Sequence, residues 1–223
     1  MHRGFAAVLL SISLLATAAV RSACIPAEVR MDATHTAIDF YLHLPPGTTR
    51  IALEDLAPYS RRDLWQSPDE SATVEETAIA ARGAHRDLHL RMGVSRQPPH
   101  QDRAYAPFQR FADGTVAVYG PQFEAPAENP LQLCVRYVPV QGEQVIGFGH
   151  ASSSPLSSAQ PWPPGYVAFG KPYVQRHHGL LLVSDRGAPA WIRQRMAVSI
   201  PRLVDLYRQR LGPGTVPTVF LFA

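Results

Sequence analysis

The chain has 223 residues and a formal net charge of +3, with 46% hydrophobic residues, 21 prolines and only two cysteines. This length is enough for one large domain or two small ones. The positive charges are scattered and form no basic stripe, which argues against a nucleic-acid-binding protein. The high proline content favours many short strands joined by turns over long helices.

The first residues have the order of a secretory signal peptide. Residues 1–3 carry a positive charge, and residues 5–20 form an uncharged, mostly apolar run that ends among small residues. This run is shorter than the ~20 residues of a typical membrane-spanning helix, so cleavage is favoured over a retained anchor. Arg21 stands where a lipobox has an aliphatic residue, which argues against lipidation at Cys24. We therefore expect removal of residues 1–22, which takes away two arginines and lowers the formal charge from +3 to +1, and export to the periplasm or beyond.

The two cysteines, Cys24 and Cys134, both lie in the exported part. In an oxidising compartment, an even count without the spacing of a zinc site indicates one disulfide. Two unrelated buried thiols are the alternative. The bond would join the mature N-terminus to a later strand and would stabilise the fold by constraining the unfolded chain.

Residues 28–136 are dominated by the alternating pattern of half-buried strands, and we expect a β-sandwich domain over residues 23–148. The runs 37–44 and 49–53 flank a Pro-Pro-Gly turn, and we expect them to form a hairpin. Further strands are predicted within residues 73–79, 85–92, 115–119 and 131–138. Short strands without a long helix between them are typical of an antiparallel β-sandwich.

The segment 149–165 is rich in Ser and Pro, and we interpret it as a linker or a long surface loop. Residues 166–223 then have the pattern of a short α/β segment, with two strands, one amphipathic helix and a terminal strand. The two strands are predicted at 166–169 and 180–183. The terminal run 218–223 is apolar and reads as a strand buried on both faces, which normally lies inside a sheet. We therefore expect this second unit to be the start of an α/β domain that is incomplete.

The only convincing helix is predicted within residues 185–211. It carries an apolar stripe at steps of three and four residues, which consists of Ile192, Met196, Ile200, Leu203, Tyr207 and Leu211. Pro189 suits the first helical turn, and Gly212 suits the end. Because Pro201 interrupts the pattern, we expect a kink or two abutting helices, the second capped by Ser199.

Two histidine pairs are candidate metal ligands. His85 and His89 have the H-x-x-x-H spacing of two zinc ligands on a helix. The residues around them alternate as in a strand, where they would lie ~13 Å apart, too far to share one ion. The adjacent His177 and His178 would point to opposite faces of a strand. We therefore expect solvated histidines and assign no metal site.

Several aromatic residues surround a stretch broken by Pro and Gly, namely Tyr105, Phe108, Phe111, Tyr119 and Phe123. They could form a sugar-stacking binding surface, or they could pack in the core beneath a long loop. Partial matches to dinucleotide-binding and kinase motifs fail at required positions. A Ser-His-Asp triad is recognised by geometry and not by sequence position, so no catalytic residue is assigned.

The last residues, RLVDLYRQRLGPGTVPTVFLFA at 202–223, read as a helix ending in Leu-Gly-Pro and then a Pro-led apolar strand. This pattern resembles the opening of the catalytic domain in gluzincin-like metallopeptidases of the membrane-alanyl and glycyl aminopeptidase type. In that family an all-β domain also comes first. The resemblance implies a zinc motif, H-E-x-x-H, on a helix further downstream. Because the motif does not occur in this sequence, no zinc ligand and no cofactor are assigned to it.

The resemblance implies that the chain is the non-catalytic N-terminal part of an exported metallopeptidase-like protein. It would wall a substrate cleft and support the catalytic half, with a downstream catalytic domain or a peptide substrate as its partner. The alternative is a self-contained exported β-sandwich module for binding or adhesion. An independent hydrolase with an unrecognised triad is a third reading. We expect neither a nucleic acid nor, after signal cleavage, a membrane as a partner.

Overall fold

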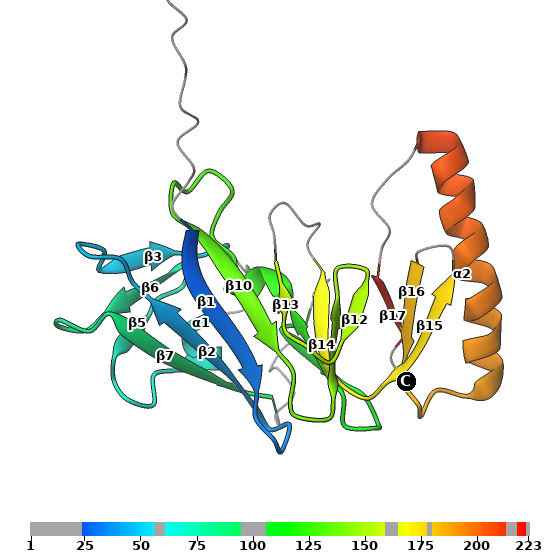
Figure 1. Ribbon diagram of the computed structural model, residues 1–223, viewed down its shortest axis with the longest axis horizontal. Helices are drawn as coiled ribbons and strands as arrows, with labels where there is room; N and C mark the ends of the chain where they lie inside the picture. The colour runs from blue at the N-terminus through cyan, green and yellow to red at the C-terminus, as the bar shows by residue number, and fades with distance from the viewer. Residues whose placement is uncertain are drawn as a thin grey trace, which may run out of the picture.

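The computed structural model describes residues 24–55, 61–94, 106–158, 165–177, 180–212 and 218–221. The predicted signal peptide lies outside these residues, so its cleavage stays a prediction. The described residues are mostly β-strand, with one long helix near the C-terminus (Figure 1). The strands form a β-sandwich extended by a further sheet, which confirms the predicted fold class.

A six-stranded sheet forms one layer of the sandwich, in the order β13-β10-β1-β2-β7-β4. Its neighbouring strands are antiparallel, except that β1 and β10 run parallel. Burial alternates along β1 and β10, so this sheet has one face in the core and one face in solvent. In chain order its strands are β1 (Cys24–Met31), β2 (Ala37–His43), β4 (Trp65–Gln66), β7 (Asp87–Gly93), β10 (Gln132–Val138) and β13 (Leu156–Ser157).

The opposite layer consists of two smaller sheets. A three-stranded sheet has the order β3-β6-β5, and a five-stranded sheet has the order β12-β11-β14-β9-β8. Side chains such as Val29, Phe40, Ile79 and Val118 bring all three sheets into one hydrophobic core. The strands are β3 (Arg50–Ala52), β5 (Ala72–Val74), β6 (Ala78–Ala81), β8 (Phe108–Arg110), β9 (Val116–Tyr119), β11 (Gln144–Gly147), β12 (His150–Ser152) and β14 (Tyr166–Gly170).

A last three-stranded sheet packs on the outer face of the five-stranded sheet, in the order β15-β16-β17. Its strands are β15 (Tyr173–His177), β16 (Leu180–Ser184) and β17 (Thr218–Leu221). Leu181 and Val183 contact Ala117 and Ala168 in a second hydrophobic cluster. Every residue of β16 is buried, because the sandwich covers one of its faces and a helix lies beside the other (Figure 1).

That helix is α2 (Ala190–Leu211), which connects β16 to the parallel strand β17 as a βαβ unit. It runs without a break through Pro201, so the expectation of two abutting helices with a cap at Ser199 is wrong. Two shorter helices are α1 (Arg61–Leu64) and the 3-10 helix η1 (Gly120–Phe123). None of the helices in the described ranges is both long and apolar enough to cross a membrane.

The predicted hairpin between residues 37–44 and 49–53 is wrong. Both strands exist, but β2 pairs with β1 and β7, whereas β3 pairs with β6 in another sheet. Since both edges of β2 are occupied, no edge is left for β3. The backbone N–H of Leu44 donates to the carbonyl of Arg86, which ties the end of β2 to the chain before β7 and not to β3.

The segment 149–165, predicted as a linker or surface loop, contributes two short strands. Strand β12 pairs with β11, and β13 pairs with β10 at the edge of the six-stranded sheet. The predicted strands at 166–169 and 180–183 exist, but they do not share a sheet. Strand β14 lies between β9 and β11 in the sandwich, and β16 lies in the β15–β17 sheet.

The predicted disulfide between Cys24 and Cys134 is confirmed, with the two Cα atoms 5.6 Å apart. It lies on the parallel pair β1–β10, where Cys24 is opposite Gln132 and Cys134 is opposite Pro26. The bond therefore links β1 covalently to β10, its parallel neighbour in the sheet.

We expect the variant Cys24→Ser/Cys134→Ser to lose about 4–5 kcal/mol of unfolding free energy, because a loop of this length restricts the unfolded chain strongly. The sequence separation of the two cysteines is 110. Urea unfolding measures the loss, and the wild-type protein in reductant should unfold at the same midpoint as the variant. Equal midpoints for the oxidised protein and the variant would show that the bond contributes nothing.

Candidate functional site

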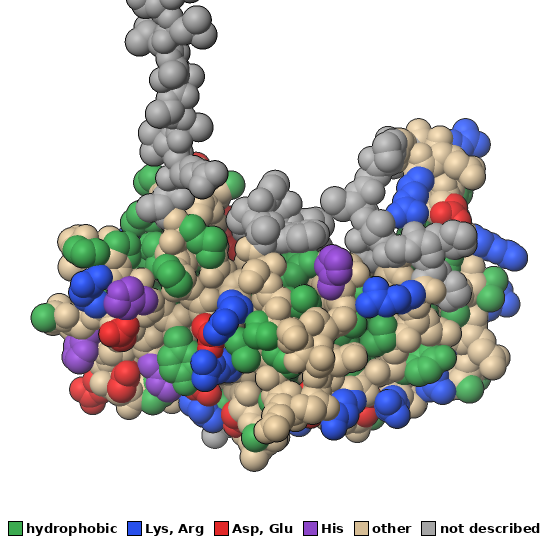
Figure 2. Space-filling view, in the orientation of Figure 1, with side chains coloured by type: hydrophobic (Ala, Val, Ile, Leu, Met, Phe, Trp, Pro, Cys, Tyr) green, Lys and Arg blue, Asp and Glu red, His purple; other side chains and the backbone are tan. Residues whose placement is uncertain are grey.

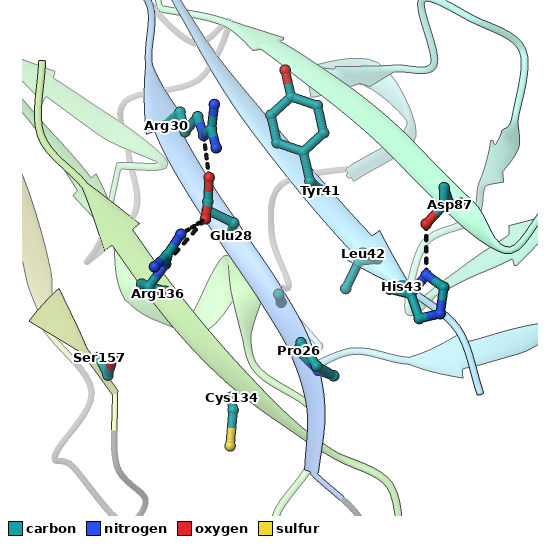
Figure 3. A pocket seen from close by; sticks show the side chains of 11 residues that line it. Pro26, Glu28, Arg30, Tyr41, Leu42, His43, Asp87, Cys134, Arg136 and Ser157 are labelled. Carbon is teal, nitrogen blue, oxygen red and sulfur yellow. Dashed lines mark hydrogen bonds and ion pairs between the residues drawn. The ribbon is translucent and has the colours of Figure 1, made fainter. Parts of the chain in front are cut away.

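The solvent face of the six-stranded sheet contains a groove of about 680 Å³ (Figure 3). Alternate residues of β1, β2 and β10 point outward here because successive side chains of a strand lie on opposite faces. Pro26 lies in the middle of the groove, with Cys134 beside it on β10. The side chains of Arg136, Tyr41 and His43 are larger and surround it. The hollow therefore follows from a small residue in a row of large ones.

Glu28 is held between two arginines on one side of the groove. Arg136 donates from Nε at 3.0 Å and also from its terminal nitrogen, and Arg30 donates from Nε to the other carboxylate oxygen. Partial burial alone would raise the pKa of Glu28, but the hydrogen bonds from Arg136 and Arg30 outweigh it and hold the pKa below its ordinary value. Glu28 is therefore a charged carboxylate that fixes both guanidinium groups.

Tyr41 stands at the other side of the groove, with its position set by its neighbours. Its ring stacks on His89, with the centroids 4.5 Å apart and the planes inclined by 13°. The guanidinium of Arg30 lies 5.6 Å from the ring centre. His89 is itself fixed through Nε2, which lies 2.8 Å from the buried carboxylate of Asp39, and Arg91 donates to both oxygens of that carboxylate at 3.0 Å.

The charged groups of the groove all have partners. Glu28 contacts both Arg30 and Arg136, and His43 Nδ1 lies 2.6 Å from Asp87. Within the described residues, the imidazoles of His43 and His89 contact the carboxylates of Asp87 and Asp39, and neither is hydrogen-bonded to a hydroxyl or a thiol. A groove with paired charges, an aromatic ring and an apolar centre fits a neutral, partly apolar ligand.

The described members of the candidate aromatic surface do not form an exposed patch. Phe108, Phe111 and Phe123 are buried in the two hydrophobic clusters, which is the core-packing alternative that the sequence left open. Tyr119 is half-buried and packs on Tyr166, with the ring centroids 5.5 Å apart. Tyr105 lies outside the described residues. The exposed aromatic residue of the groove, Tyr41, carried no signal in the sequence beyond its alternating position.

The histidines do not form a metal site in the described part of the chain. His89 lies on β7, and His85 lies in the turn before that strand. The side chain of His177, like the whole of His178, is outside the described residues. Within the ranges that the structure describes, no three His, Cys, Asp or Glu residues lie close enough together to hold a metal ion.

A buried polar cluster inside the sandwich had no signal in the sequence. The fully buried Arg61 of α1 donates to the carbonyl oxygens of Glu76 at 2.7 Å and Glu54 at 2.9 Å, and burial lowers its pKa to about 10. The hydroxyl of Tyr137 is also fully buried and finds no hydrogen-bond partner among the described residues. A Cβ on Gly120 would lie 3.7 Å from this hydroxyl and 3.9 Å from Glu124 Oε1. It would also lie only 3.0 Å from the carbonyl oxygen of Gly165, so a larger residue at this position would be crowded.

Glu124 is the titratable group of this cluster that changes charge near neutral pH. Burial, and then the negative charge of Glu54, raise its pKa to about 7. Shifts of this kind mark functional sites in many enzymes, but structural clusters produce them as well. Glu124 lines neither the groove over Pro26 nor another site described here, and we treat it as a structural group whose burial makes the fold less stable at high pH.

The variant Glu124→Gln tests that assignment. The folded carboxyl keeps its proton up to pH about 7, whereas the unfolded one loses it near its ordinary pKa of 4.5. Folding must therefore take up a proton within this window, and the stability of the wild-type protein falls as the pH rises through it. Relative to the variant, the wild type should lose about 3 kcal/mol between pH 4 and pH 8. Urea unfolding at both pH values measures the difference, and parallel curves for the two proteins would contradict the assignment.

No protein-family model matches this chain, and no curated protein is significantly similar to it.

Proposed function

We propose that the chain is the non-catalytic N-terminal part of an exported metallopeptidase-like protein, in which it supports a catalytic domain and walls its substrate cleft. The observation that carries the proposal is the apolar stripe of α2 predicted from the sequence. Only the first part of this stripe is covered by the chain itself.

Ile192, Met196 and Ile200 are half-buried beside the β15–β17 sheet. Leu203 and Tyr207 continue the same stripe but are 47% and 60% exposed. In Figure 1 the C-terminal half of α2 extends past the ends of β15 and β16. The stripe therefore leaves its own sheet and continues as an uncovered apolar surface.

An uncovered stripe of this kind is a contact surface. A large apolar side chain gains about 1.5–3 kcal/mol when it is moved from water into a packed interface. Exposed apolar patches that adjoin a covered one are typical of interfaces between domains or proteins. A domain that packs against the C-terminal half of α2 would cover Leu203 and Tyr207. It would add either strands to the β15–β17 sheet or helices beside α2.

Two further features support this proposal. The order of the elements, a β-sandwich followed by a βαβ unit, is the order that the resemblance to gluzincin-like metallopeptidases implies. The disulfide fits an oxidising compartment outside the cytoplasm. The proposal takes no zinc ligand from the described residues, since none of them form a metal-binding group, and assigns the zinc motif to the catalytic domain.

A second candidate function is a self-contained exported binding module. The groove over Pro26 favours it, because the groove presents a fixed aromatic ring and paired charges to solvent on a rigid sheet. In this case the uncovered stripe of α2 has no role in supporting a catalytic domain.

Reading the gene past residue 223 separates the two functions. An in-frame H-E-x-x-H within about one domain length supports the proposed function. A stop codon directly after residue 223 overturns it and leaves the binding module.

In the longer protein, we expect Leu203→Ser/Tyr207→Ser to lower the free energy of unfolding by about 3 kcal/mol or more, because both side chains are then buried at the domain contact. In residues 1–223 alone the same change should stay within about 1 kcal/mol, as for other exposed positions. The matched control is Val198→Ser, a residue that is 53% exposed on another face of α2 and should have a small effect in both proteins. Equal effects of the double variant in the long and the short protein would contradict a contact through this stripe.

A further inference from the structure

A second face of α2, separate from the stripe, is also unusual. It contains Trp191, Arg195, Val198, Arg202 and Leu206, which follow one another at steps of three or four residues. Trp191 is 69% exposed, Val198 53% and Leu206 47%. Apolar and basic side chains thus alternate along one line of the helix. We call this set the outer face of α2.

The outer face carries positive charge without a balancing partner. The helix has five arginines and a single acidic residue, Asp205. Arg193 donates to the backbone carbonyls of Arg186 and Ala188, and Arg208 lies 3.9 Å from Asp205. Arg195 and Arg202 make no hydrogen bond or ion pair with any described residue. Their charges therefore point into solvent between apolar neighbours.

A shallow trough of about 510 Å³ runs along this face. It is lined by Trp191 and Val198 as apolar groups, by the donors Arg195 and Arg202, and by Gln194 and Ser199 as uncharged hydrogen-bonding groups. No carboxylate lines it. A guanidinium binds phosphate oxygens with paired hydrogen bonds, and an indole ring prefers the boundary between water and hydrocarbon. These groups together fit a molecule with an anionic phosphate head and an apolar tail.

The position of α2 decides which occupant can reach this face. The helix forms one end of the molecule, where basic and hydrophobic side chains lie side by side (Figures 1 and 2). A flat surface can therefore contact its whole length. A second copy of the chain is disfavoured, because pairing two outer faces would bring unbalanced arginines together. An acidic protein would match the charge of Arg195 and Arg202, but that charge alone would not explain why the largest exposed side chain of the trough is the apolar Trp191.

We propose that the outer face of α2 binds the surface of a membrane that contains anionic phospholipids. Arg195 and Arg202 contact the phosphate groups, while Trp191, Val198 and Leu206 enter the boundary between head groups and acyl chains, as in helices that lie in the membrane interface. This contact is independent of the proposed function, since the stripe that faces a catalytic domain lies on another side of the helix. The sequence led us to expect no membrane partner after signal cleavage. That expectation rested on the length of the apolar runs, so it concerned a membrane-spanning segment and not contact with a membrane surface.

Vesicle sedimentation tests this proposal. The chain is produced without residues 1–22, because their apolar run would itself bind lipid. It is mixed with vesicles of phosphatidylcholine that contain about one third phosphatidylglycerol, and with pure phosphatidylcholine vesicles as the neutral reference. We expect binding to the anionic vesicles, loss of binding at high salt, and a blue shift of tryptophan fluorescence. The chain has three tryptophans. Trp65 is 4% exposed and cannot give that shift by entering lipid, and Trp162 lies outside the described residues, so the variant Trp191→Ala is needed to assign the shift to Trp191.

Two variants and a matched control localise the contact. Arg195→Gln/Arg202→Gln should weaken binding about 30-fold, since each basic residue near an anionic surface contributes about one factor of five. Trp191→Ala should weaken binding and abolish the fluorescence shift. The matched control is Arg62→Gln/Arg82→Gln, which removes two exposed arginines, one in α1 and one directly after β6. This variant should leave binding unchanged.

Three results would overturn the proposal: no sedimentation with anionic vesicles, equal sedimentation with neutral vesicles, or equal losses in the outer-face and control variants. Polyglutamate serves as a probe for an acidic protein partner. Arginine-dependent binding to polyglutamate without binding to vesicles would show that the outer face recognises an acidic protein and not a membrane.

Discussion

The parallel pairing of β1 with β10 is the contact on which the rest of the fold depends. It joins residues 24–30 to residues 132–138, and parallel strands cannot be connected by a tight turn. The pair therefore closes a long loop that contains strands β2 to β9. Two side-chain links on the solvent face stabilise it, the Cys24–Cys134 bond and the ion pair between Glu28 and Arg136. The same links form part of the groove, so the candidate site rests on the most constrained pair of strands.

The five-stranded sheet explains how a further layer is attached to the sandwich. Its two faces carry side chains of different size, since Val116 and Val118 enter the main core while Ala117 and Ala168 face outward. Small side chains let a second sheet approach closely and pack without voids. Leu181 of β16 packs on this outer face. The five-stranded sheet is therefore buried on both faces, and its outer face attaches the βαβ unit to the sandwich.

The alternating pattern of the sequence predicted where most strands lie, but not which strands pair. Pairing depends on free edges, and β2 has none to offer β3, so a Pro-Gly turn between them did not produce a hairpin. The cysteine count predicted the disulfide because only one pairing was possible. The groove had no local signal, since Pro26, Tyr41 and Arg136 come together only after three strands have paired. The raised pKa of Glu124 depends on burial, which a sequence pattern does not show.

The geometry of α2 follows from a mismatch in length. A helix of 22 residues is about 33 Å long, at 1.5 Å per residue. Strand β16 has five residues and spans about 17 Å, at about 3.3 Å per residue. The C-terminal half of the helix therefore projects beyond the strands that it accompanies, as Figure 1 shows. In this half Leu203 and Tyr207 are exposed, although a helix is stabilised mainly by packing of its apolar face. The proposed catalytic domain would supply that packing for the part of the stripe that the described residues leave exposed.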